Sequence, residues 1–134
     1  GARDDIPALL GALDLFIFPS HYEGLGIALI EAQAAGVPVL ASRAVPAESD
    51  VGLGLVRFAS LEEGPARWAA AGAGLAAAPR PAWEERRRAI EAAGYDLERL
   101  VARLTAWYGT EGAPQPCSPP IGGGLEGRSL SKNT

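Results

Sequence analysis

Residues 16–42, FIFPSHYEGLGIALIEAQAAGVPVLAS, contain two apolar runs with a glycine-bearing loop and a helix-like segment between them. The apolar run at 15–18, stopped by a proline, is typical of a strand buried on both faces. Residues 26–35 predict a helix, with Gly36 in the usual place for a C-terminal glycine. Residues 38–42 predict a second buried strand. A strand, a helix and a strand at this spacing form a βαβ unit, so we expect the two strands to be parallel.

Further elements are expected on both sides of this unit. Asp4 or Asp5 can cap a short helix that precedes it. After the unit come a third, shorter strand and three helices. The expected ranges are 6–12 for the first helix, 55–58 for the strand, and 63–78, 82–93 and 96–108 for the later helices. The predicted fold class is therefore α/β, with a partial Rossmann-like parallel sheet flanked by helices.

The composition changes at about residue 110. Residues 1–109 are rich in Ala, Leu and Arg, whereas residues 110–134 are rich in Pro, Gly and Ser and contain Cys117 and Lys132, the only cysteine and lysine. Such a segment buries too little apolar surface to offset its ordering entropy. We expect a domain at 1–109 followed by a disordered tail at 110–134. The chain has no methionine, which suggests a fragment or a processed product.

The overall composition excludes several classes of function. The net charge of -4 gives no electrostatic reason to expect nucleic acid as a partner. No window approaches the roughly 20 apolar residues of a membrane span. With a single histidine and a single cysteine, a zinc site is not expected, and we predict neither a metal nor a cofactor. The single cysteine fits a reducing compartment, so we expect the cytoplasm.

The βαβ unit also predicts where a ligand binds. In open α/β sheets, ligands bind outside the carboxyl ends of the strands, where the loop at 19–25 begins. The following helix directs its free N–H groups and its positive dipole end into that crevice, which suits a phosphate. Gly24 and Gly26 let the backbone approach closely. Leu29 stands where a dinucleotide fingerprint has its third glycine, which counts against that motif.

Two glutamates lie near this expected anion site. On a helix that starts near residue 26, Glu31 shares a face with apolar residues such as Ile27 and Ala34, and it lies about 7 Å from the helix start. A carboxylate there could accept hydrogen bonds from the hydroxyls of a ribose, while Glu23 in the loop meets a sugar or a developing positive charge. The alternative is that Glu31 pairs with Arg43 and that Glu23 is a solvated loop residue.

These residues also carry a resemblance to a known family. The stretch FPSHYEGLGIALIEAQAAGVPVLAS resembles the C-terminal, donor-binding domain of family 4 glycosyltransferases, which have the GT-B fold, and Glu23 and Glu31 match the E-x7-E motif of that family. GARDDIPALLGALDLFIFPS is similar to the preceding family segment. VPAES, FASLEEGPARWA and GYDLERLVARLTAWY resemble its exopolysaccharide and capsule branch. The resemblance covers residues 1 to about 109.

The resemblance implies transfer of a sugar from a nucleotide diphosphate sugar to a glycan or lipid-linked acceptor, usually with retention and without a metal. Glu31 would hold the ribose hydroxyls. Glu23 would contact the transferred sugar and stabilise an oxocarbenium-like transition state. For His21 the alternative is a buried, hydrogen-bonded structural role. The expected catalytic residue is thus Glu23, and the expected donor-binding residues are His21, Gly24, Leu25, Gly26, Ile27 and Glu31.

The chain departs from the family pattern at its N-terminal side. It lacks the N-terminal, acceptor-binding domain and the first strands of the donor domain, which carry an Arg and a Lys against the pyrophosphate. Arg3 and Arg43 are candidate substitutes. We expect the fragment to transfer nothing by itself and its sheet to have an exposed edge. The full enzyme would touch a membrane only peripherally.

Two other functions stay open. A sugar-nucleotide epimerase could have the same fold, although E-x7-E in the context SHYEG argues against it. The chain could also be a non-catalytic, truncated α/β fragment whose arginine-rich segment at 84–103 packs on a partner.

Overall fold

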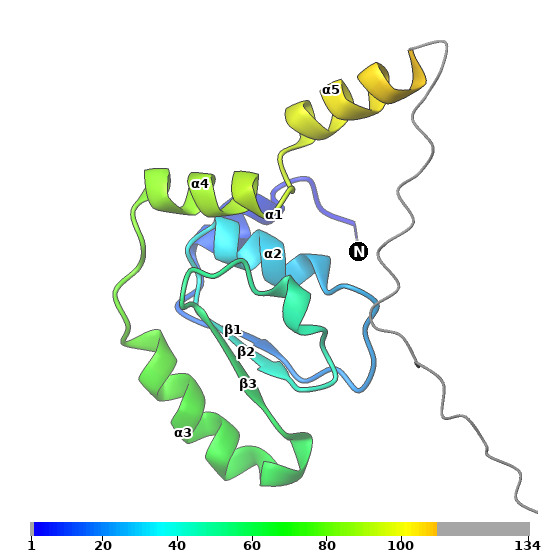
Figure 1. The fold of residues 1–134 in the computed structure, drawn as a ribbon. Coiled ribbons are helices and arrows are strands. Elements are labelled where there is room, and N and C mark those ends of the chain that lie inside the picture. Colours follow the sequence, from blue (N-terminus) through cyan, green and yellow to red (C-terminus); the bar gives the residue numbers. More distant parts are fainter. Residues whose placement is uncertain (1, 110–134) are drawn as a thin grey trace, which may run out of the picture. The chain divides into compact units, whose positions relative to one another are not determined.

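The computed structural model describes residues 2–109 of the 134-residue chain (Figure 1). These residues divide into two units, one that ends at Leu97 and one that begins at Glu98, and each is described by itself. The predicted tail at 110–134 lies outside the described residues.

The order of elements follows the prediction, and their ends differ from it by at most two residues, as is common for helix and strand ends. The helices and strands are α1 (Ile6–Gly11), β1 (Phe16–Phe18), α2 (Ile27–Ala34), β2 (Val39–Ser42), β3 (Val56–Ala59), α3 (Gly64–Ala76), α4 (Trp83–Ala92) and α5 (Leu97–Tyr108). Two short 3-10 turns, Ala47–Ser49 and Leu61–Glu63, lie between them.

The three strands form one parallel sheet in the order β1-β2-β3. Phe16 pairs with Val39, and Val39 pairs with Val56, so the carboxyl ends of all three strands meet at one edge of the sheet. The predicted fold class, a parallel sheet flanked by helices, is confirmed.

Helices cover both faces of the sheet (Figure 1). The central strand β2 is buried along its whole length, and its side chains alternate between two cores. Val39 and Ala41 join the core under α1 and α2, together with Leu29. Leu40 joins the core under α3, together with Trp68. The sheet is therefore the middle layer of three.

Strand β1 differs from its prediction. It was expected to be buried on both faces, but Ile17 is 49% exposed and Phe16 and Phe18 are only partly buried. The reason is topological, because β1 is an edge of the described sheet and too little of the molecule covers its outer face. The two phenylalanine rings stack on each other with centroids 5.8 Å apart.

A buried glutamine joins α2 to the segment between β2 and β3. The Nε2 atom of Gln33 donates to the carbonyl oxygens of Leu29 and Ser49 at 3.1 and 2.7 Å. Its Oε1 atom accepts a hydrogen bond from the Val51 amide at 3.0 Å. Gln33 is fully buried, so these bonds satisfy polar groups that water does not reach.

Helix α4 contacts the C-terminal end of α2. Arg86 donates through Nη1 to the Ala34 carbonyl at 2.7 Å, and its guanidinium carbon lies 5.4 Å from the centroid of the Trp83 ring. Gly36, with φ of 78°, ends α2 as predicted and lies under this arginine. A Cβ atom at Gly36 would come within 3.1 Å of the Arg86 Cδ atom, so a glycine lets the two helices approach.

Helix α5 belongs, from Glu98 onward, to the second unit. Its apolar side chains at 100, 101, 104 and 107 follow helical spacing along one stripe, and all of them are exposed. Among the described residues, no helix is both long enough and apolar enough to span a membrane.

Candidate functional site

The loop at residues 19–26 leaves the carboxyl end of β1, as predicted, and side chains hold it to the sheet. The Ser42 hydroxyl, at the end of β2, donates to the Ser20 carbonyl oxygen. The Ser20 hydroxyl donates to the Tyr22 carbonyl at 2.8 Å. The Ser42 bond therefore ties the loop to the carboxyl end of β2, and the Ser20 bond stabilises a turn within the loop.

Gly26 makes the turn from this loop into α2. Its φ and ψ angles are 72° and 48°, in the left-handed region that glycine adopts without strain. It is also buried, and a Cβ atom at this position would lie 3.1 Å from the Val45 Cγ1 atom. Gly24, by contrast, is exposed and has open space where a Cβ would stand.

The start of α2 is left open. No side chain caps it, and its first turn contains no acidic residue. Within residues 2–109, the amides of Ile27 and Ala28 have no hydrogen-bond acceptor. Such amides at the positive end of an eight-residue helix are suited to bind an anion at the carboxyl end of the sheet.

Glu23 lies in the loop and is partly buried. Its Oε1 atom is 3.4 Å from the Ser20 hydroxyl, which already donates at shorter distance to a carbonyl. No described cation forms an ion pair with this carboxylate.

Glu31 does not lie where the sequence placed it. The face that it shares with Ile27 was expected to face the core, but Glu31 is exposed and Ile27 is 62% exposed. The buried residues of α2 are Leu29, Ile30, Ala32 and Gln33. The sequence pattern was ambiguous because both faces of this helix consist largely of Ala, Leu and Ile.

The exposed position of Glu31 leaves its carboxylate open. It lines one cavity of about 480 Å³ with Leu10 and Trp83, and another of about 290 Å³ with Leu25 and Tyr95. The alternative of an ion pair with Arg43 is not observed, and the Glu31 carboxylate has no hydrogen-bond or ion-pair partner among the described residues.

His21 is exposed in the structure, so the buried, hydrogen-bonded position considered for it is not observed. It lines a cavity of about 360 Å³ together with Ser42, Arg43 and Glu62, at the carboxyl ends of the strands. Its side chain has no hydrogen-bond partner within the described part of the chain.

The candidate cation Arg3 is engaged elsewhere. It donates two hydrogen bonds to the Asp5 carboxylate at 2.7 and 2.6 Å, so Asp5 stands at the start of α1 without capping it. This pairing lowers the pKa of Asp5 and raises the pKa of Arg3 from their ordinary values. Arg3 is therefore a poor substitute for a cation that contacts pyrophosphate.

The structure adds residues that sequence reasoning missed. Gln33 and Ser42 hold the segments that surround the crevice, but no motif marks a buried polar residue inside an apolar run. No group of three or more metal-ligating side chains occurs among the residues that the structure describes.

The family assignment follows from comparison with known proteins. The family described as "Glycosyl transferases group 1" matches residues 1–93, which include every predicted element from α1 to α4 and both glutamates. The chain belongs to this family.

Individual relatives are similar over shorter or longer parts of the chain. EpsF of Bacillus subtilis (strain 168), named as a candidate glycosyltransferase, is 40% identical over 108 residues, which cover 81% of this chain and 28% of EpsF. O-antigen chain mannosyltransferase B of Escherichia coli is 35% identical over 94 residues, covering 60% of this chain and 25% of that protein. An Escherichia coli galactosyltransferase, UDP-Gal:alpha-D-GlcNAc-diphosphoundecaprenol alpha-1,3-galactosyltransferase, is 48% identical over 42 residues, or 31% of this chain and 11% of the enzyme. The chain thus spans about a quarter of the length of the first and second of these relatives. No solved structure matches it.

Proposed function

We propose that this chain is the donor-binding part of a family 4 glycosyltransferase of the GT-B fold. The enzyme would move a sugar from a nucleotide diphosphate sugar to a glycan or a lipid-linked acceptor, with retention of configuration. Support comes from the family match and from relatives whose names describe polysaccharide and diphospholipid glycosylation.

The observation that carries the proposal is the open start of α2. Unsatisfied amides lie at the carboxyl end of β1, with Glu23 in the loop before them and Glu31 about 7 Å further along the helix. Neither carboxylate has a cationic partner in the described part of the chain. This arrangement suits a ligand with a diphosphate in its middle and hydroxyl groups at both ends.

In the proposed complex, the amides of Gly24, Leu25, Gly26 and Ile27 receive the diphosphate or the sugar next to it. Glu31 accepts hydrogen bonds from the ribose hydroxyls. Glu23 faces the transferred sugar and stabilises the positive charge that develops on it as the leaving phosphate departs. His21, which is exposed beside the crevice, contacts the donor.

The proposal requires more protein than this chain. The acceptor-binding domain and a cation for the pyrophosphate would come from a segment that corresponds to the rest of EpsF, 28% of which the chain matches. We place the complete enzyme in the cytoplasm, with peripheral membrane contact where its acceptor is lipid-linked.

The two glutamates can be tested separately in a full-length enzyme that contains this chain as its matched segment. Glu31→Gln should mainly weaken donor binding in calorimetry, because the ribose contact is the same in the ground and transition states. Glu23→Gln should mainly lower turnover, by about 10² to 10³, since it removes one preorganised electrostatic group.

Glu48→Gln provides a matched control, because Glu48 is exposed and lines none of the cavities around the crevice. Full turnover in Glu23→Gln would show that Glu23 is only a loop residue. If Glu31→Gln bound the donor with normal affinity, the proposed contact between Glu31 and the ribose hydroxyls would be wrong.

A further inference from the structure

A second charged feature lies at β3, away from the glycine loop. A cavity of about 480 Å³ opens at this strand, and Arg43, Arg57 and Arg67 line it together with Phe58, Glu63 and Ala71. We call it the arginine pocket. It shares none of its residues with the loop and helix start that the proposed donor site uses.

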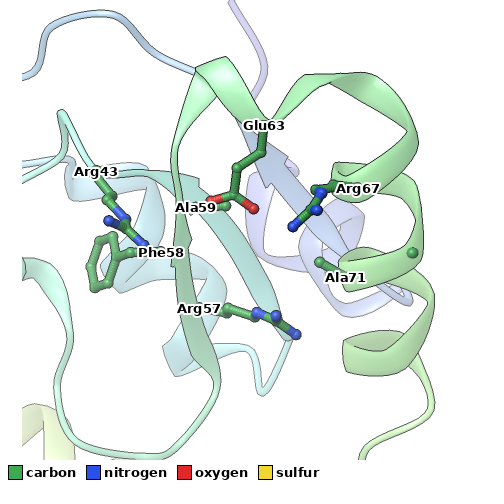
Figure 2. Close-up of a pocket in the computed structure, with 8 residues that line it drawn as sticks. Arg43, Arg57, Phe58, Ala59, Glu63, Arg67 and Ala71 are labelled. Carbon is green, nitrogen blue, oxygen red and sulfur yellow. The ribbon is translucent and has the colours of Figure 1, made fainter.

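The three arginines that line the pocket come from different parts of the chain. Arg57 points to the α3 face of the sheet, because it alternates with Phe58 along β3 and shares the side of Ala59. Arg67 comes from the first turns of α3. Figure 2 shows both side chains extending toward the space in front of Ala71, while Arg43 lies on the other side of β3 beside Phe58. Since Ala70 and Ala71 are small, the wall of α3 leaves this space open.

The pocket gathers the unpaired arginines of the first unit. Five other arginines there donate to a described acceptor: Arg3, Arg80, Arg86, Arg87 and Arg88. Arg43, Arg57 and Arg67 have no such acceptor within residues 2–109, and all three line one cavity.

The carboxylate in the pocket does not neutralise this charge. Glu63 accepts a hydrogen bond from the Ser60 amide at 3.0 Å as part of a capping box, and it forms no ion pair with a described arginine. On the α3 face, two guanidinium groups and the Glu63 carboxylate leave one positive charge in excess, and Arg43 adds its charge from the other side of β3, in a chain whose net charge is -4. Such an excess attracts an anion, and a guanidinium fork matches phosphate and carboxylate oxygens in pairs.

We propose that the arginine pocket binds an oxoanion, a phosphate or carboxylate group of a ligand, held chiefly by Arg57 and Arg67 with Arg43 at the rim. Because Arg43 also lines the cavity of His21, the oxoanion would lie next to the crevice at the carboxyl ends of the strands. The proposal concerns binding alone and does not depend on glycosyl transfer.

The test uses the 134-residue chain and follows the arginine Nε–H and backbone amide signals by NMR at constant ionic strength. Inorganic phosphate and glucuronate are titrated separately, as are vesicles of phosphatidylglycerol and of phosphatidylcholine. We expect the NMR signals of Arg57 and Arg67 to shift and to reach saturation with at least one of these oxoanion probes. Arg57→Gln combined with Arg67→Gln should weaken this binding at least about tenfold, since each substitution removes a charge-assisted contact.

Arg88→Gln is the matched control, because Arg88 is an exposed arginine outside the pocket that donates to the Glu84 carbonyl at 3.1 Å. It should bind phosphate or glucuronate as the parent chain does. A response to free phosphate or glucuronate supports a soluble source of the group, and a response to anionic vesicles alone supports a lipid headgroup.

Three results would overturn the proposal. The first is no saturable binding of any probe below about 10 mM. The second is an equal loss of affinity in the control and in the double variant, which would mean diffuse attraction. The third is phosphate-dependent shifts at the amides of Ile27 and Ala28 without shifts at Arg57 and Arg67, which would support the donor site instead.

Discussion

At the scale of single residues, the two glycines of the loop have different tasks. Gly26 has a positive φ and a buried position against Val45, whereas Gly24 is exposed with free space around it. The turn into α2 requires the first, whereas at the second the space that a Cβ atom would occupy is open. From the sequence, both glycines could allow a ligand to approach the backbone closely. Only the structure distinguishes them, through the positive φ of Gly26 and the atoms around it.

A matched pair of substitutions tests this difference. Gly26→Ala should lower the free energy of unfolding by about 1–2 kcal/mol, because a Cβ is unfavourable in the left-handed region and would also press on Val45. Gly24→Ala should change the free energy of unfolding by less than about 0.5 kcal/mol. Urea unfolding followed by circular dichroism measures both values. Similar midpoints for the two variants would contradict the assignment.

For Glu31, the sequence predicted the position in the chain but not the exposure of the side chain. Its match to the E-x7-E spacing located it on α2, and the structure places it there. Its exposure could not be predicted, because a short helix made largely of Ala, Leu and Ile has no single apolar stripe that marks the core. The exposed carboxylate fits a ligand contact better than the buried one that the sequence indicated, although its role stays a proposal.

At the scale of elements, α2 and the segment after β2 depend on Gln33. Three hydrogen bonds join this side chain to Leu29, Ser49 and Val51. The segment also carries Val45, which packs against Gly26 at the start of α2. Through these contacts one buried amide helps to position the helix whose open end forms the candidate anion site.

Replacing this amide should therefore be costly. Gln33→Leu, which keeps a similar volume, leaves the Ser49 carbonyl and the Val51 amide without their partner, and we expect a loss of about 2–4 kcal/mol in the free energy of unfolding. Glu48→Gln, on the exposed side of the same segment, should cost less than about 0.5 kcal/mol. Denaturant titration of both variants decides the point, and a neutral Gln33→Leu would show that water replaces the amide.

The order and type of the elements were predictable because apolar runs, prolines and glycines mark strands and helix ends locally. The burial of β1 was not, since it depends on which strands stand beside it. An apolar run such as LFIF is compatible with a central strand and with an edge strand, so it does not predict how much of the strand is buried. The hydrogen bonds of Gln33 also link residues 16 and 18 positions apart, a separation that no local pattern reports.

At the scale of the whole molecule, the described sheet ends in β1 on one side and in β3 on the other. The edge at β1 is apolar, with Ile17 half-exposed between two phenylalanines. An unprotected apolar edge strand pairs readily with other chains.

The isolated chain should therefore self-associate as its concentration rises, and Ile17→Lys should suppress this by placing a charge on the edge. Tyr22→Lys is the control, because Tyr22 is 87% exposed but lies in a loop outside the strand. Sedimentation velocity over a range of concentrations gives the average mass of each variant. A parent chain that stays monomeric at all concentrations, or a control that suppresses association equally, would contradict this prediction.

The contact between Gly36 and Arg86 also bears on how the sequence can change over evolutionary time. A side chain at position 36 is opposed twice, by the positive φ and by the arginine that lies over it, and loss of Arg86 would remove only the second obstacle. The same loss would leave the Ala34 carbonyl and the Trp83 ring without their cation. Substitutions at these positions are thus linked: a side chain at position 36 avoids a clash only after Arg86 has changed, and even then the positive φ continues to favour glycine.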